Sequence, residues 1–170
     1  WLEGRGTRLY LICGIDDATS ACPGARFALS DSCNENMCVL KQIVETKGIP
    51  LSFYCDKDSK FKTTRHKGLH YQLKGDYDQT QIARTLSELG VEIIYAHSPQ
   101  AKGRVERAWG TFQDRLCSEL RLHKISTLQA ANSYLTRVFI PKHNSKFARL
   151  PKAKGSAYRA LPEDLDLSNI

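Results

Sequence analysis

Short apolar segments separated by turn residues open the chain. Residues 7–15 are apolar and rich in strand-forming residues, so they predict a buried strand. A second strand is expected over residues 24–29, antiparallel to the first after a tight turn. Residues 1–6 have the composition of a hairpin turn, which implies that a further partner strand precedes Trp1 and is absent from this chain.

The pattern then changes to helical periodicity and alternates with strands. Ser32 and Glu35 form a capping-box pattern before an apolar stripe that ends at Gly48, which predicts a helix of about four turns. Residues 51–55 are short, apolar and aromatic, and they predict a buried strand whose end leads into Asp56. This helix-then-strand order favours a parallel crossover.

A basic stretch over residues 57–75 has little apolar periodicity and is interpreted as an exposed loop. A helix over residues 79–89 and a strand over residues 91–96 follow it.

A turn at residues 99–103 is expected to precede a long helix. Its buried stripe consists of Val105, Ala108 or Trp109, Phe112, Leu116 and Leu120. A last helix is predicted to begin at Ser126 and to be stopped by Pro141.

The length of 170 residues suits one ordinary domain with its own core. The alternation of strands and helices makes this an α/β domain, which we expect to occupy residues 1–148. Residues 149–170 combine proline, glycine and basic residues and are interpreted as a linker toward a further, C-terminal domain.

The charge of the chain favours a polyanionic partner. A formal charge of +7 and a pI near 9.2 promote electrostatic attraction and counterion release at a phosphate backbone. No apolar run approaches the roughly 20 residues that span a bilayer, and the N-terminus lacks the apolar stretch of a signal peptide. We therefore expect a soluble, intracellular protein that does not bind membranes, in which the six cysteines are reduced core residues.

Two carboxylates stand out by position. Asp56 follows a central strand, and Glu106 falls in the first turn of the long helix, so both are expected at one edge of the sheet. Carboxylate oxygens suit a hard cation such as Mg²⁺ or Mn²⁺, and a helix N-terminus favours the ionised form of Glu106. Each residue taken alone also fits a structural role, in a turn or as a surface charge.

Two motifs together resemble one family. The stretch SPQAKGRVER at residues 98–107 resembles the segment around the last acidic residue of integrase-type insertion-sequence transposases. The stretch YCDKDSKF at residues 54–61 resembles the segment around the second acidic residue of the same family. Further similarity lies at residues 1–6, 15–19 and 144–147, so the resemblance covers nearly the whole chain and is closest to the ISNCY-like transposases.

The resemblance implies an RNase H-like fold, with a central mixed sheet of an antiparallel meander plus parallel strands, flanked by helices. It implies that Asp56 and Glu106 are the second and third members of a DDE triad that binds Mg²⁺ or Mn²⁺. The first Asp of the family precedes the turn at residues 1–6, and so lies upstream of Trp1. Asp16, Asp17 and Asp58 are acidic as well, but a turn role is favoured for each of them.

Basic residues near these carboxylates are candidates for phosphate contacts. They are Lys60, Lys62, Lys102, Arg104 and Arg107.

The function that the resemblance implies is DNA strand cleavage and strand transfer in transposition, with transposon ends and target DNA as partners. The resemblance also implies a bacterial cytoplasmic protein that acts at the nucleoid as a homo-oligomer. The alternatives are a non-catalytic nucleic-acid-binding remnant of a decayed mobile element and a cellular nuclease of the RNase H-like class.

Overall fold

The computed structural model describes residues 1–55, 61, 79–95, 103–163 and 165–167, apart from the side chain of Arg104. The strands are β1 (Tyr10–Gly14), β2 (Gly24–Ala28), β3 (Ile49–Pro50), β4 (Ser52–Cys55), β5 (Glu92–Tyr95) and β6 (Tyr158–Arg159). The helices are α1 (Cys33–Lys47), α2 (Gln81–Glu88), α3 (Gly103–Leu122), α4 (Leu128–Tyr134), a π-helix η3 (Leu135–Phe139) and α5 (Ile140–Phe147). The α/β class predicted from the sequence is confirmed, with both antiparallel and parallel strand pairs.

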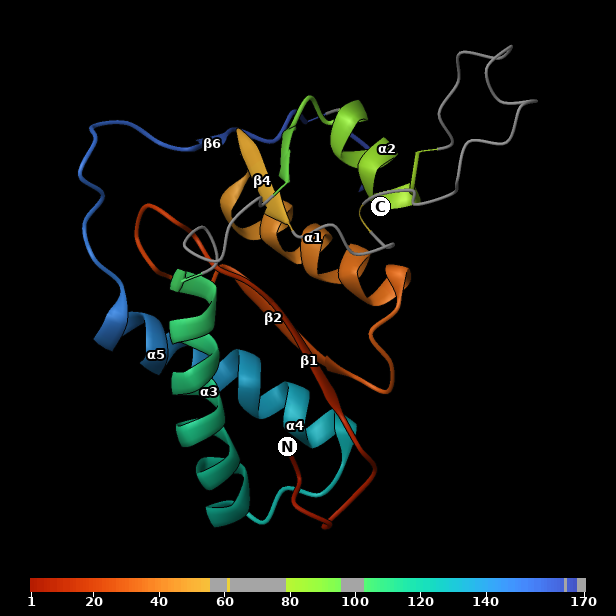
Figure 1. The fold of residues 1–170 in the computed structure, drawn as a ribbon, viewed down its shortest axis with the longest axis vertical. Coiled ribbons are helices and arrows are strands. Elements are labelled where there is room, and N and C mark those ends of the chain that lie inside the picture. Colours follow the sequence, from red (N-terminus) through yellow and green to blue (C-terminus); the bar gives the residue numbers. More distant parts are fainter. Residues whose placement is uncertain (56–60, 62–78, 96–102, 164, 168–170) are drawn as a thin grey trace.

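The antiparallel hairpin β1–β2 lies between two layers of helices. Figure 1 shows α1 on one side of this hairpin and α3, α4 and α5 on the other. Side chains alternate across the pleat, so each face of the hairpin contributes to a different core. Leu11 and its partner Phe27 face α3 and α4, whereas Ile12 packs toward α1.

The face toward α1 is fitted to one side chain of that helix. Gly14 and Gly24 are opposite each other in the ladder. A Cβ atom added to Gly14 would lie 2.7 Å from Cδ1 of Ile43, and one added to Gly24 would lie 2.8 Å from Cγ1 of the same residue. The two glycines thus leave the space that Ile43 fills.

The opposite face carries the larger core. Phe112, Leu116 and Leu120 of α3 are fully buried, as the helical stripe predicted. Val105 belongs to the same predicted stripe but is 40% exposed, so the buried part of α3 begins after its first turn. The turn predicted at the N-terminus is present, and the Trp1 ring packs on Phe27 at 5.6 Å between centroids.

A second group of elements packs on the other part of α1. Met37, Leu40 and Val44 of α1 contact buried residues of α2, β3 and the segment before β5. Strand β4 pairs in parallel with β5, and α2 lies between these two strands in the chain. The crossover predicted from the helix before β4 is not seen among the described residues, because no ladder there joins β4 to β1 or β2. The sequence predicts that β4 is buried, but Tyr54 of this strand is 55% exposed.

The described strands form three two-stranded sheets, β1–β2, β3–β6 and β4–β5. The sequence had predicted a central mixed sheet, and no ladder among these residues joins the pairs into one. Helix α1 links the pairs instead, because it packs against both β1–β2 and the elements around β5.

The segment after α5 returns to the domain, whereas the sequence predicted a linker for residues 149–170. Strand β6 pairs with β3, and Arg159 donates hydrogen bonds to the carbonyls of Leu89 and Gly90 at 2.5 and 3.0 Å. Leu161 and Leu165 pack against the core formed by α1 and α2. Partial burial of these leucines and the pairing of β6 hold this segment against α1 and β3; where the domain ends stays a prediction.

The last predicted helix is continued rather than stopped at Pro141. It begins at Leu128, with Thr127 as its N-cap instead of Ser126, and runs through η3 into α5. Proline lacks the N–H for an ordinary helical bond and crowds the preceding turn. Pro141 lies next to the π-helical turn, where the N–H of Ile140 bonds the carbonyl of Leu135, five residues back. The wider turn accommodates the proline, so the prediction of a stop was wrong.

Two asparagine side chains fasten this helical run to the chain around β2. Asn132 accepts from the Phe27 N–H at 2.7 Å and donates to the Phe27 carbonyl at 2.9 Å. Asn144 does the same at Cys22, at 2.8 and 2.9 Å. Each amide satisfies one backbone donor and one acceptor, as a neighbouring strand would.

None of the helices in the described ranges is long and apolar enough to cross a membrane.

Replacing Asn132 or Asn144 by Ala is expected to lower the free energy of unfolding by about 1–3 kcal/mol each, since a part-buried backbone donor and acceptor lose their partners. Ser133→Ala, at an exposed neighbouring position, should change it by less than about 0.5 kcal/mol. Urea denaturation of the three variants measures this. Losses at Asn132 and Asn144 no larger than at Ser133 would contradict the clamping role.

Candidate metal-binding edge at the ends of β4 and β5

The parallel pair β4–β5 sets the geometry of the candidate site. Cys55 is the last residue of β4, and its partner in the ladder is Tyr95, the last residue of β5. Both strands therefore end side by side at one edge. Asp56 is the next residue of the sequence after Cys55, but it lies outside the described residues.

Tyr95 fixes this edge by a contact that the sequence did not indicate. Its hydroxyl donates a hydrogen bond of 3.0 Å to the carbonyl of Phe61, and the Phe61 ring packs on Phe53 of β4 at 6.0 Å between centroids. Burial, and secondarily the neighbouring Cys55 thiol, raise the pKa of Tyr95, so the hydroxyl keeps its proton for this bond. Phe61 is thereby held against the same pair of strands from which Asp56 departs.

Glu106 lies in the first turn of α3, as predicted, and its side chain is exposed. The unpaired N–H groups of a helix start favour a negative charge at this position. An exposed carboxylate at a helix start can bind a cation from solvent. Because Asp56 lies outside the described residues, the pairing of the two carboxylates stays a prediction.

Of the predicted DNA-binding residues, some lie in the part of the chain that the structure describes and others lie outside it. Arg107 is exposed on α3, beside Glu106. The backbone of Arg104 belongs to the first turn of α3, while Lys60, Lys62 and Lys102 lie outside the described residues. Within the described part of the chain, no three His, Cys, Asp or Glu side chains come together as a metal site.

The cysteines were expected to be reduced core residues. All six are described, and none forms a disulfide in the structure. Cys22 and Cys55 are buried, whereas Cys38 is exposed on α1, which corrects the expectation for that residue. Burial raises the pKa of Cys13 far above its ordinary value and that of Cys22 to about 12.

Iodoacetamide is therefore expected to label Cys38 in the folded protein at pH 8.5, while Cys13 and Cys22 react only after unfolding, because the thiolate is the nucleophile. Peptide mapping by mass spectrometry after labelling, with and without urea, checks this. Labelling of Cys22 at the rate of Cys38 without urea would show that the hairpin core opens.

Two curated relatives match nearly the whole chain. A Sinorhizobium fredii protein named "Putative transposase y4bF" is 38% identical over 161 residues, which cover 95% of this chain and 34% of that protein. The "Transposase for insertion sequence IS1202" of Streptococcus pneumoniae is 35% identical over 162 residues, which cover 95% of this chain and 33% of that protein. No family model and no solved structure matches the chain.

The chain thus spans about a third of the length of these relatives. Their similarity extends over the β1–β2 hairpin, the β4–β5 edge and the helices that follow, and is not limited to one motif. The resemblance of this chain to insertion-sequence transposases is therefore confirmed.

Proposed function

We propose that this chain is the catalytic segment of a DDE transposase, which cuts DNA strands and joins them to a target in the intact protein. The observation that carries the proposal is the parallel register of β4 and β5. It puts Cys55, the residue before Asp56, beside Tyr95, from whose strand the chain continues to Glu106 at the start of α3. Relatives named as transposases match this whole stretch of sequence.

The strand pairing supports an RNase H-like fold for the intact protein. Among the described strands, β1 pairs only with β2 and β4 pairs only with β5. In the proposed fold, a strand that precedes Trp1 turns through residues 1–6, pairs with the other edge of β1 and reaches β4. One added strand would then join the β1–β2 and β4–β5 pairs into one sheet. The same strand would carry the first acidic residue of the triad.

The chemistry of the donors fits a divalent cation. Asp56 and Glu106 offer carboxylate oxygens, which Mg²⁺ and Mn²⁺ prefer, and Glu106 is exposed to solvent. Two bound Mg²⁺ ions supply activation of the attacking water or 3′-hydroxyl and charge stabilisation at the leaving 3′ oxygen.

The protein itself contributes position and charge. Asp56 follows the last residue of β4 in the sequence, the first turn of α3 holds Glu106, and the apolar stripe from Phe112 to Leu120 fixes α3 against the hairpin. Arg107 is exposed beside Glu106, where it would pair with a DNA phosphate.

Metal binding tests the two carboxylates. Asp56→Asn or Glu106→Gln is expected to weaken Mn²⁺ binding by about tenfold or more, because each removes a charged ligand. Glu92→Gln, an exposed carboxylate on β5, is the matched control and should bind as the wild type does. Electron paramagnetic resonance of free Mn²⁺ gives the affinities, and binding that survives the double Asp56→Asn, Glu106→Gln substitution would remove the basis for the proposal.

Strand transfer tests the reaction. In a protein extended upstream through the strand proposed to precede Trp1, Glu106→Gln is expected to reduce strand transfer at least about a hundredfold, or about 2.7 kcal/mol in the barrier, while DNA binding is kept. The present chain alone should show little activity, because the proposed fold assigns the first carboxylate of the triad to a strand upstream of Trp1. Equal activity of the short and extended proteins on labelled oligonucleotides would contradict the assignment of the triad.

A further inference from the structure

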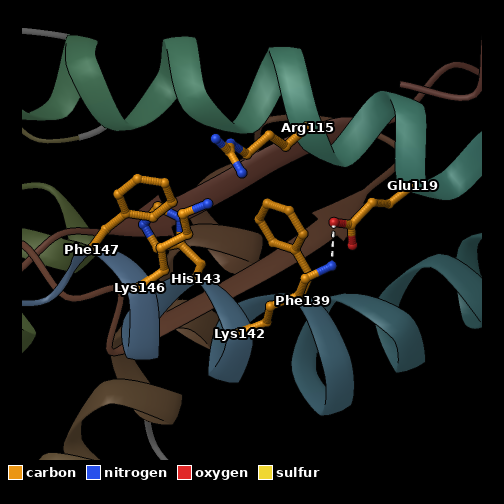
Figure 2. A pocket seen from close by; sticks show the side chains of 7 residues that line it. All are labelled: Arg115, Glu119, Phe139, Lys142, His143, Lys146 and Phe147. Atoms are coloured by element: carbon orange, nitrogen blue, oxygen red, sulfur yellow. Dashed lines mark hydrogen bonds and ion pairs between the residues drawn. The ribbon is translucent and has the colours of Figure 1, made fainter.

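A second basic site lies between α3 and α5, away from the carboxylates. Figure 2 shows this cleft, with Arg115 pointing from α3 toward the side chains of α5. Its walls are formed by Arg115, Glu119, Phe139, Lys142, His143, Lys146 and Phe147. The cleft encloses about 60 Å³, several times the roughly 10–15 Å³ that one water needs, so it can admit a small polyatomic group.

Among the described residues that line the cleft, the one carboxylate is already engaged. Glu119 accepts from Lys142 at 2.8 Å and from the Tyr134 hydroxyl at 2.7 Å. Burial works to raise the pKa of Glu119, but these two hydrogen bonds outweigh it and hold the pKa below its usual value. Glu119 is thus ionised and balances Lys142.

Arg115 and Lys146 have no such counterion. In the described part of the chain, neither of them has a carboxylate within ion-pair distance. Both instead approach the ring of Phe147, with 5.2 Å from Arg115 Cζ and 5.7 Å from Lys146 Nζ to the centroid. Two cations on one ring repel each other, and an anion between them would relieve that repulsion.

His143 adds a buried ring nitrogen near the same cleft. It is 6% exposed, and its ring packs against Phe112 at 4.7 Å and Phe147 at 4.9 Å between centroids. Among the described residues, its Nδ1 has no hydrogen-bond partner. Buried polar atoms are rarely left without a partner, and His143 is one of the residues that line the cleft, so its Nδ1 is a candidate to bind a group held there.

We propose that this cleft binds a phosphate group of the DNA backbone, with Arg115 and Lys146 pairing with its oxygens and His143 Nδ1–H donating a hydrogen bond. The choice of DNA as the source of the phosphate rests on the proposed function. Arg115 and Lys146 already lie over the ring of Phe147, which leaves little room for a DNA base to stack on that ring. The two positive charges favour an anionic phosphate instead.

The cleft is a separate contact and not part of the metal site. Arg115 follows Glu106 by nine residues, which is about two and a half turns of helix and about 14 Å along the axis. The two side chains therefore start from opposite sides of α3. DNA held at Arg115 is a different stretch from the one at Glu106, so the cleft would hold and orient the substrate.

DNA binding without metal tests the proposal apart from the chemistry. Fluorescence anisotropy with a labelled duplex of about 20 base pairs in EDTA compares the wild type with the Arg115→Gln, Lys146→Gln double variant. The matched control is Arg137→Gln, Lys154→Gln, which removes two exposed positive charges elsewhere. The cleft variant is expected to lose at least about tenfold in affinity. The slope of the logarithm of the binding constant against the logarithm of the salt concentration should become shallower by about one, as for the loss of one phosphate contact. Equal losses in the two double variants would overturn the proposal, since net charge alone would explain them.

The substitution His143→Phe tests the proposed Nδ1 hydrogen bond separately from the charges of Arg115 and Lys146. It keeps an aromatic ring in the cleft and is expected to weaken DNA binding severalfold without changing the salt slope, with a melting temperature at or above that of the wild type. Unchanged affinity would exclude a role for Nδ1.

The Arg115→Gln, Lys146→Gln double variant should bind Mn²⁺ as the wild type does. A failure of the cleft proposal is therefore distinguishable from a failure of the metal site proposed at Asp56 and Glu106.

Inorganic phosphate identifies the source of the anion. In the proposed arrangement, free phosphate at about 10 mM perturbs the His143 ring resonances only weakly, while DNA perturbs them at micromolar concentration. Phosphate that binds as tightly as DNA would show a site for a free anion and would overturn the assignment to the backbone.

Discussion

Burial of the β1–β2 hairpin on both faces is the constraint on which the other layers depend. Leu11 and Phe27 reach one core, and Ile12 reaches the other, from neighbouring positions of a two-stranded ladder. A shift of one residue in register would exchange the two faces and bring Arg26, now paired with Glu35 at 2.9 Å, into the larger core. The register of this hairpin therefore fixes where α1 and α3 can lie, and with α3 the place of Glu106.

Local patterns predicted most of the elements. Half of the capping pattern of Ser32 and Glu35 is present, since the Ser32 hydroxyl accepts from the Glu35 N–H at 3.3 Å while the Glu35 carboxylate pairs with Arg26. The stripe of Phe112, Leu116 and Leu120 is buried as expected. These signals are local, because a few residues of sequence contain both partners of each contact.

Contacts between distant parts of the chain were not predictable in the same way. Nothing in the composition around Tyr158 indicates that it pairs with Pro50, so a segment with linker-like composition contributes a strand that packs on the rest of the chain. Tyr95 and His143 likewise look ordinary in sequence, and their roles follow from the neighbours that folding gives them. At the candidate site, position in the sequence identified both carboxylates, while the structure describes the strand end before Asp56 and the helix turn around Glu106.

The π-helical turn at η3 has a consequence for how α4 and α5 follow β2. Asn132 and Asn144 are twelve residues apart, which in an uninterrupted α-helix would place them about 120° apart around the axis. The π turn absorbs about one residue, so the two amides come back into phase after about three turns. The axial distance between them is then about 16 Å, close to the span of the five-residue step from Cys22 to Phe27 in extended chain. The irregular turn beside Pro141 thus acts as a phase correction that matches a helical repeat to an extended strand.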